Sequence, residues 1–305
     1  MPNTTSLVLG LAWGASPPLD LGESALLIVL AFAVINLSSA IGAQVNTLSD
    51  YELDSQDNRK RYLVEAIDGF GQKRLKWIIV VEFLFAFGVV SLLWLLTGKA
   101  ALLVMWLFGI LLGCAYSASP LRFKSKSWLA LGVLVLVLCV LPVFFMYHLF
   151  AVGLEPVFLV ALAGMALTVY GLIVPTEIRD YFGDKAMNVV TMAVRLGLEK
   201  VSLFGITLLS VGSVLFGLAF FLKATFELQP ILNSILLILP VVVIFVLKKY
   251  ATLYYLSKKY ASAENPNLTE KDIVALAAHN PQWIMLVTQT YSMLSIILLI
   301  SNFLL

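Results

Sequence analysis

Long apolar runs separated by short polar segments make up most of this 305-residue chain. A membrane-spanning helix needs about 20 consecutive, mainly apolar residues. The pattern predicts eight spans, at residues 25–47, 77–96, 102–119, 128–150, 157–175, 201–222, 231–247 and 284–304. A shorter apolar stretch at residues 6–15 raises the expected number of helices to about nine. Strand-like alternation of convincing length does not occur in the sequence, so we expect an all-α polytopic membrane protein.

The composition excludes an ordinary soluble domain. Hydrophobic residues make up 61% of the chain and charged residues 12%, whereas soluble domains are roughly 45–50% apolar and about 25% charged. A soluble core cannot hide this much apolar surface, so lipid must cover much of it. We expect a single integral membrane domain, residues 1–305, with its helices around a central cavity.

Basic residues are distributed unevenly between the two ends of the predicted spans. With the short stretch at residues 6–15 counted as the first helix, all of the 20 Lys and Arg residues except Lys99 and Lys223 lie in the loops after helices two, four, six and eight. Because loops rich in Lys and Arg stay in the cytoplasm, we expect these loops and the N-terminus inside the cell. Two of the loops, residues 55–76 and 185–200, are long enough to form short helical caps over a cytoplasmic mouth.

Two acidic segments follow the second and the sixth predicted helices. Their polar residues are three or four positions apart, and on a helix four positions correspond to one face and a rise of about 6 Å. The segments contain Asn46, Asp50 and Asp54, and Glu177, Asp180 and Asp184. Two like charges about 6 Å apart repel by roughly 3 kcal/mol at an effective dielectric constant near 20. The segments therefore need counter-ions.

The residue types around the acidic segments favour Mg²⁺ and a phosphorylated ligand. Mg²⁺ prefers oxygen ligands and typically bridges carboxylates to substrate phosphates. His148 and His279 lie on opposite sides of the predicted membrane, so they do not indicate a zinc site. Basic residues close to the segments are Arg59, Lys60, Arg61, Arg122, Lys124, Arg179 and Lys185. This combination above an apolar interior suits a diphosphate head on a hydrocarbon tail.

Four motifs together resemble the UbiA superfamily of intramembrane prenyltransferases, over nearly the whole chain. Two are the Asn-x-x-x-Asp-x-x-x-Asp pattern ending at Asp54 and the Asp-x-x-x-Asp pattern ending at Asp184. The third leaves the fourth helix as Tyr116-Ser117-Ala-Ser-Pro-Leu-Arg122-Phe-Lys124. The fourth is the segment Thr191-Met-Ala-Val-Arg195-Leu-Gly197.

The resemblance implies a reaction and a set of site residues. Two Mg²⁺ ions would be held by Asn46, Asp50, Asp54, Asp180 and Asp184, and the four aspartates would be catalytic. The substrate would be bound by Asn46, Lys60, Arg61, Tyr116, Ser117, Arg122 and Lys124. A prenyl group would move from an allylic donor, such as geranyl or geranylgeranyl diphosphate, to an aromatic or lipid acceptor. The surroundings would be membrane lipid, and no nucleic-acid partner is expected.

Three other interpretations remain open from the residues alone. Either acidic segment taken alone is typical of a solvated membrane surface. An ion-coupled transporter could use the aspartates as cation sites, although such sites usually lie near the bilayer midplane on broken helices. A lipid enzyme that transfers phosphoalcohols would combine its aspartates in one motif, whereas this chain has two separated motifs.

Overall fold

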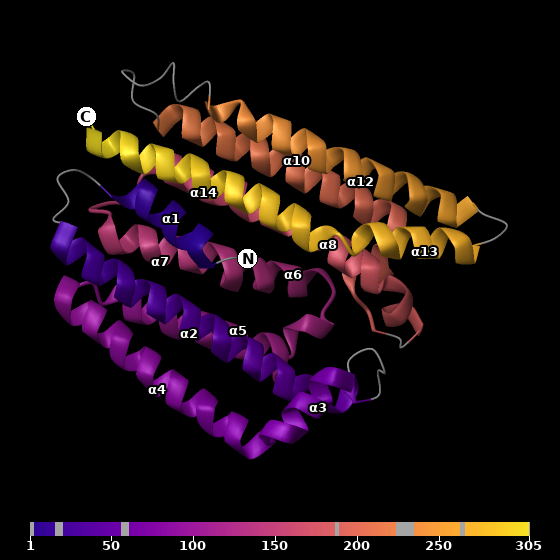
Figure 1. The fold of residues 1–305 in the computed structure, drawn as a ribbon, viewed down its shortest axis with the longest axis horizontal. Helices are drawn as coiled ribbons and strands as arrows, with labels where there is room; N and C mark the ends of the chain where they lie inside the picture. The colour runs from indigo at the N-terminus through magenta and orange to yellow at the C-terminus, as the bar shows by residue number, and fades with distance from the viewer. Residues whose placement is uncertain are drawn as a thin grey trace. The chain divides into compact units, whose positions relative to one another are not determined.

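A computed structural model describes residues 3–15, 21–55, 61–186, 189–223, 235–262 and 266–304 of the chain. All regular elements in these ranges are helices, and none is a strand. Figure 1 shows their arrangement as a ribbon. The expected all-α fold is therefore confirmed.

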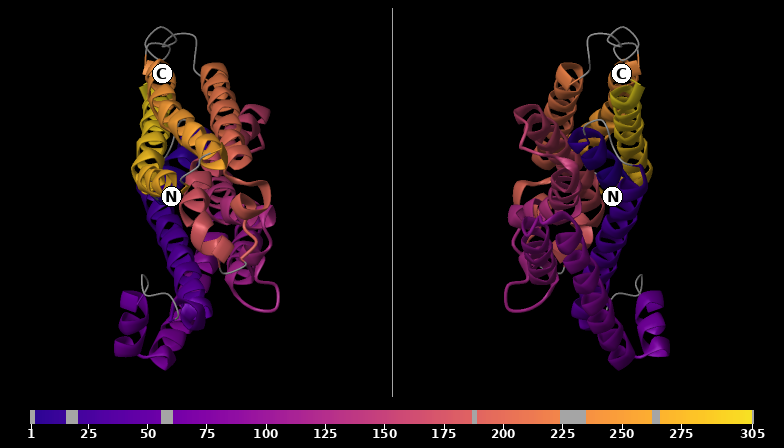
Figure 2. Two further views of the ribbon diagram at one scale, coloured as in Figure 1. Left: turned by 90° about the vertical axis from the view of Figure 1, so that its right-hand side faces the viewer. Right: turned by 90° about the vertical axis from the view of Figure 1, so that its left-hand side faces the viewer.

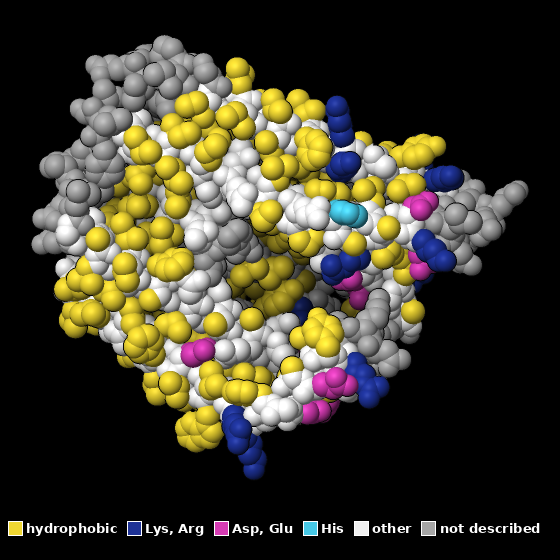
Figure 3. Space-filling model, viewed as in Figure 1, with side chains coloured by type: hydrophobic (Ala, Val, Ile, Leu, Met, Phe, Trp, Pro, Cys, Tyr) yellow, Lys and Arg dark blue, Asp and Glu magenta, His cyan; other side chains and the backbone are white. Residues whose placement is uncertain are grey.

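Seven helical stretches in the described ranges are long and apolar enough to cross a membrane. They comprise α2 (Leu21–Asp54), α4 (Gln72–Thr97), the run α6 (Trp128–Val135), η3 (Leu136–Val140) and α7 (Leu141–Phe150), α8 (Pro156–Ala186), α10 (Leu198–Lys223), α12 (Ile238–Ser262), and α14 (Asn280–Leu304). Two shorter apolar helices are α1 (Asn3–Gly14) and α5 (Ala101–Ser117). Hydrophobic side chains cover much of the surface visible in Figure 3, as contact with lipid requires. The chain is an integral membrane protein, and the count of nine spans stays a prediction.

The chain forms two compact units, which we describe separately. The larger unit contains Met1–Pro18 and Ser125–Leu305, and the smaller unit contains Leu19–Lys124. The α2 acidic segment belongs to the smaller unit, and the α8 acidic segment belongs to the larger unit.

Close packing of α8 against α10 organises the larger unit. A Cβ atom on Gly164 would lie 2.5 Å from the backbone nitrogen of Phe216, and one on Gly212 would lie 2.5 Å from that of Thr168. Only glycine permits this approach, which is typical of helix contacts inside membranes. Helices α12 and α14 also contact this pair, α12 through α10 and α14 through α8 (Figures 1 and 2).

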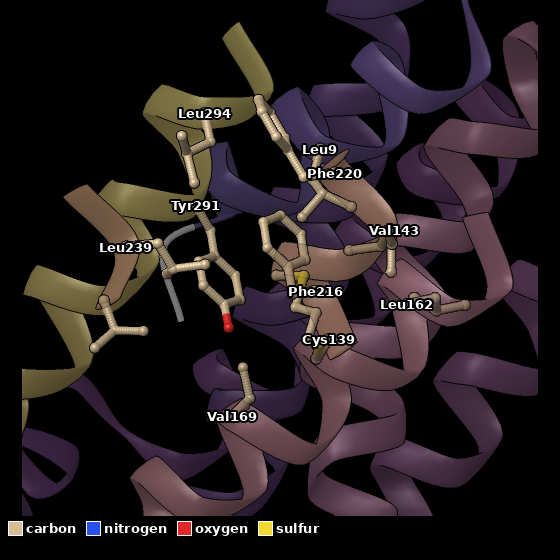
Figure 4. Close-up of a cluster of buried hydrophobic side chains, with 14 of the residues drawn as sticks. Leu9, Cys139, Val143, Leu162, Val169, Phe216, Phe220, Leu239, Tyr291 and Leu294 are labelled. Atoms are coloured by element: carbon tan, nitrogen blue, oxygen red, sulfur yellow. The ribbon is translucent and has the colours of Figure 1, made fainter. Parts of the chain in front are cut away.

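A cluster of buried side chains fills the core of the larger unit (Figure 4). The rings of Phe216 and Tyr291 stack with their centroids 4.0 Å apart. The hydroxyl of Tyr291 lies 2.8 Å from the side-chain oxygen of Thr168, so the polar end of this ring has a partner inside the core. Leu9 of α1 and Cys139 of η3 join the same cluster, which connects the N-terminal helix to the later ones.

The smaller unit is built on contacts of α2 with α4 and α5. The indole Nε1 of Trp106 on α5 donates a hydrogen bond of 3.0 Å to the hydroxyl of Ser38 on α2. A further helix, α3 (Arg61–Phe70), precedes α4 and contacts both α2 and α4. Gly71 joins α3 to α4 with φ of 94°, a backbone conformation that favours glycine, so the chain turns sharply there (Figure 1).

Short α-helices form in three of the four loops that are rich in basic residues. Helix α3 lies in the predicted cap loop 55–76, and α9 (Met192–Leu196) lies in the predicted cap loop 185–200. Helix α13 (Pro266–Ala277) was not expected from the sequence. The position of these loops over a cytoplasmic mouth stays a prediction.

Candidate functional site

The first candidate cluster lies at the end of α2, which remains helical as far as Asp54. We call Asn46, Asp50, Ser117, Arg122 and Lys124 the α2 cluster. Lys124 Nζ donates to Asp50 Oδ1 and, at 3.1 Å, to Asn46 Oδ1. Ser117 Oγ donates to the same amide oxygen at 2.8 Å. The ammonium group of Lys124 therefore contacts both oxygens. Asn46 Oδ1 and Asp50 Oδ1 face one common point, which this cationic group occupies.

Two basic residues share the carboxylate of Asp50. Besides Lys124, Arg122 Nη2 lies 3.2 Å from Asp50 Oδ1. The side chains of Asp50 and Lys124 are only 14% and 16% exposed, so water screens this pair less than it screens a surface pair. Burial lowers the pKa of Lys124, and the hydrogen bond that Lys124 donates to Asp50 opposes that shift. The cluster therefore carries more positive than negative charge around Asp50.

The backbone conformation of Arg122 is unusual. Its φ is 36°, in the left-handed region that residues other than glycine seldom adopt. A hydrogen bond of 2.9 Å from its amide to the carbonyl of Ala118 holds this turn after α5. Such backbone strain is concentrated at functional sites in proteins. Here the turn brings both Arg122 and Lys124 to the end of α2.

The second candidate cluster lies on the last turns of α8. We call Glu177, Arg179, Asp180, Asp184 and Lys185 the α8 cluster. Arg179 makes two hydrogen bonds to Asp180, at 2.9 and 3.0 Å, with both side chains partly exposed. Because a bidentate guanidinium–carboxylate pair is a strong and directional contact, Asp180 has a defined orientation beside a positive charge.

Glu177 has a different role from the aspartates of its segment. Its Oε2 accepts a hydrogen bond of 3.1 Å from the backbone amide of Ala193, in the first turn of α9. The hydroxyl of Thr191 accepts from the amide of Val194 and caps the same short helix. Glu177 thus holds the loop after α8 against the acidic segment, which spacing in the sequence does not reveal.

Helix α8 reaches the acidic segment by continuing through Pro175. The sequence predicted that a span ends at this proline, and the helix itself continues beyond it to Ala186. Proline has no amide hydrogen for the carbonyl four residues earlier, and here that carbonyl belongs to Gly171. The hydroxyl of Tyr250 on α12 donates to it at 3.0 Å. Asn280 Nδ2 donates to the next carbonyl, of Leu172, at 2.8 Å.

The predicted substrate-binding residues are placed unequally. Ser117 is buried and Tyr116 is half-buried at the end of α5, while Arg122 and Lys124 reach Asp50. Arg61 begins α3, is 75% exposed and pairs with Glu65 at 3.0 Å. Lys60 lies outside the described residues. The roles of all of these residues in substrate binding stay predictions.

The oxygen donors fit a metal ion that takes few ligands from protein. Among the described residues, no group of three or more His, Cys, Asp and Glu side chains is placed to hold a metal ion. The α2 cluster offers the carboxylate of Asp50 and the amide oxygen of Asn46 at one cation position. Mg²⁺ usually keeps several waters and binds one or two carboxylates together with substrate phosphates. The donor set therefore fits Mg²⁺ bound with a phosphorylated substrate.

Comparison with known proteins gives one family match and several structural matches. Residues 4–262 match the family model described as the UbiA prenyltransferase family. A UbiA homolog from Archaeoglobus fulgidus bound to GPP and Mg²⁺ superposes with a TM-score of 0.61 and 16% identity, covering 93% of this chain and 94% of that one. A digeranylgeranylglyceryl phosphate synthase gives 0.65 and 14%, covering 96% and 93%. The apo UbiA homolog from Aeropyrum pernix K1 gives 0.58 and 15%, covering 93% and 96%. No curated protein sequence matches the chain.

Proposed function

The chain belongs to the UbiA prenyltransferase family, and from this premise we propose that it is a Mg²⁺-dependent enzyme that uses a prenyl diphosphate donor. Transfer of a prenyl group within the membrane is the activity of its family. The proposal adds the metal, the donor and the residues that bind them.

The observation that carries the proposal is the convergence of groups at the end of α2. Two oxygen donors, from Asn46 and Asp50, and two cationic groups, from Arg122 and Lys124, meet where a long apolar helix ends. A divalent ion held by the oxygens would carry the diphosphate, and the cationic groups would contact its remaining oxygens. The prenyl chain is a hydrocarbon and would lie among apolar helices.

The metal ligands proposed are Asn46, Asp50 and Asp54 for one ion, and Asp180 and Asp184 for a second. Asp54 is buried at 7% exposure, one turn beyond Asp50, which suits a carboxylate that is shielded from bulk water. Bound Mg²⁺ would supply stabilisation of the negative charge on the leaving diphosphate. Relatives provide the precedent, since the homolog from Archaeoglobus fulgidus binds GPP or DMAPP together with Mg²⁺.

The chain's own residues have separate tasks in this reaction. Lys124 and Arg122 would hold the diphosphate oxygens while the allylic carbon–oxygen bond breaks, and Ser117 would keep the amide of Asn46 in place. Lys60, Arg61 and Tyr116 would add contacts to the same diphosphate. Glu177 would position the α9 loop beside Asp180. The loops would limit the access of water, which otherwise captures the allylic cation.

The acceptor is proposed as an aromatic or lipid nucleophile. The diphosphate leaves with the electron pair of the broken bond, the acceptor supplies the pair for the new bond, and the acceptor then loses a proton. A lipid acceptor has a precedent in the digeranylgeranylglyceryl phosphate synthase, whose fold this chain shares. The donor could be geranyl or geranylgeranyl diphosphate.

We further propose that the site faces the cytoplasm and that the N-terminus lies inside. The basic loops after the even-numbered predicted helices support this orientation, because such loops remain on the cytoplasmic side. We do not favour the transporter alternative, because members of the chain's family transfer prenyl groups.

The decisive experiment uses purified protein and a panel of prenyl diphosphates. It measures the binding of each prenyl diphosphate and the release of diphosphate. Asp50→Asn and Asp180→Asn should each lower turnover about 100-fold or more, as loss of a key electrostatic group does. Chelation of Mg²⁺ should abolish donor binding, and added Mg²⁺ should restore it. Glu52→Gln is the matched control, because it removes an exposed charge from the same helix as Asp50.

Two outcomes would contradict the proposal. Full activity in both aspartate variants would exclude the acidic segments from the reaction. An equal loss in Glu52→Gln would show a general effect of charge at the end of α2. Size-exclusion profiles and unfolding curves must match the wild type, so that the loss of turnover reports chemistry rather than folding.

A further inference from the structure

Helix α3 has one wide apolar face made of two adjoining stripes, and within the described part of the smaller unit only one stripe is covered by protein. Ile67 is 6% exposed and lies with half-buried Leu63 on the covered stripe. A second apolar stripe, at four-residue spacing, consists of Tyr62, Ala66 and Phe70, all exposed. Tyr62 is 68% and Phe70 45% exposed.

A polar stripe lies on the opposite side of the helix. Arg61 pairs with Glu65 at 3.0 Å, and Asp68 accepts a hydrogen bond of 2.6 Å from the hydroxyl of Tyr51 on α2. Around the helix axis, the three stripes therefore face protein, water and a third, apolar environment. A helix in a fully aqueous loop needs only the first two.

The connection to α4 places that third environment at the membrane boundary. Gly71 alone separates α3 from α4, whose long apolar run begins with Trp77, itself 71% exposed. Tryptophan and tyrosine are enriched at the headgroup level of membranes. The exposed rings of Tyr62, Phe70 and Trp77 thus lie close in the chain to the point where α4 enters the bilayer.

The charge around these rings is positive. Lys73, Arg74 and Lys76 in the first turns of α4 are exposed, and no carboxylate of the described chain forms an ion pair with any of them. The nearby acids Glu65 and Asp68 already have partners. Basic side chains beside interfacial aromatic residues favour anionic lipid headgroups.

We propose that α3 and the first turns of α4 form an interfacial surface that binds anionic phospholipid. Tyr62, Ala66 and Phe70 lie at the boundary between headgroups and acyl chains. Lys73, Arg74 and Lys76 contact the anionic headgroups. None of these residues belongs to the α2 cluster or the α8 cluster. The surface therefore anchors α3 at the membrane whatever the substrate is.

Spin labels at two adjacent positions test the orientation of α3. Ala66→Cys and Glu65→Cys are introduced separately, after replacement of Cys114 and Cys139, and reconstituted in phosphatidylcholine vesicles with phosphatidylglycerol. The label at position 66 should be accessible to oxygen dissolved in the bilayer. The label at position 65 should be accessible to a water-soluble nickel chelate. Positions 65 and 66 lie at nearly the same height along the helix, and their side chains point in different directions. Each label therefore serves as the control for the other.

Two results would overturn this orientation. Equal access of the nickel chelate to both labels would place the Tyr62–Ala66–Phe70 stripe in water. Exclusion of both reagents from the label at 66 would indicate burial against a protein, either another chain or a second copy. Donor binding measured in each labelled variant establishes that the background remains folded.

A second measurement tests the choice of lipid. The triple variant Lys73→Gln/Arg74→Gln/Lys76→Gln should retain less phosphatidylglycerol relative to phosphatidylcholine during purification, by about fivefold for each charge removed. Removal of the same number of charges farther from the predicted span, at Lys258, Lys259 and Lys271, should leave the ratio near that of the wild type. An equal fall of this lipid ratio in both variants would show that it depends only on the net charge of the protein. That result would overturn the assignment of anionic phospholipid to this surface.

Discussion

Tyr250→Phe removes a single hydroxyl from the point where α8 passes its internal proline. The hydroxyl donates to the carbonyl of Gly171, whose usual amide donor four residues later is missing because residue 175 is proline. Tyr250 is 1% exposed, and its ring lies 5.6 Å from that of Trp283, a packing contact that phenylalanine preserves. The substitution therefore isolates the hydrogen bond.

The expected cost is larger than for an ordinary hydrogen bond between membrane helices. Such bonds average about 0.6 kcal/mol, with values up to about 1.7 kcal/mol. A buried acceptor that loses its only donor costs about 1–3 kcal/mol. We expect Tyr250→Phe to lower the free energy of unfolding in mixed micelles by about 1.5 kcal/mol, close to tenfold in the equilibrium constant.

A double-mutant cycle provides the control. In a Pro175→Ala background, the alanine amide can donate to Gly171, so Tyr250→Phe should cost about 0.6 kcal/mol or less. Tyr254→Phe, one turn later on α12, removes a half-buried hydroxyl that donates to Glu199 at 3.2 Å and should also cost little. An equal cost of Tyr250→Phe with and without Pro175 would refute the reasoning.

Three further predictions concern packing, loop order and ligand binding. Gly212→Ala should destabilise the protein by about 1–3 kcal/mol, because its Cβ would lie 2.5 Å from the backbone nitrogen of Thr168. Gly217→Ala, on the same helix, has 3.5 Å to the nearest atom and should be neutral or stabilising in the same unfolding assay. Glu177→Leu should increase amide hydrogen exchange in residues 189–197, whereas Glu177→Gln keeps an acceptor and should resemble the wild type. Lys124→Met should weaken donor binding about tenfold or more in calorimetric titrations, and unchanged affinity would remove it from the diphosphate site.

Much of the helical architecture follows from local pattern. The lengths of the apolar runs predict the long helices, since each run must match the thickness of the bilayer. Asn46, Asp50 and Asp54 are four residues apart, and they share one stripe because α2 continues as a helix to Asp54. The resemblance assigned Lys124 and Asp50 to one substrate site, but it did not predict their contact, because spacing says nothing about partners 74 residues apart.

Other features depend on partners that are distant in the sequence. Helix α8 continues through Pro175 because Tyr250, 79 residues from the carbonyl it binds, replaces the missing amide. Asn280, 108 residues away, donates to the next carbonyl of the helix. Glu177 looks like a third acid in its segment, yet its carboxylate holds α9. The exposed apolar stripe of α3 is identified only in the structure, which shows which apolar residues of this helix are covered. The sequence by itself determined where the long apolar helices lie, because apolar length and helical period are local properties. Tertiary structure decided which polar groups meet, because each hydrogen bond depends on a partner brought close by the packing of other helices.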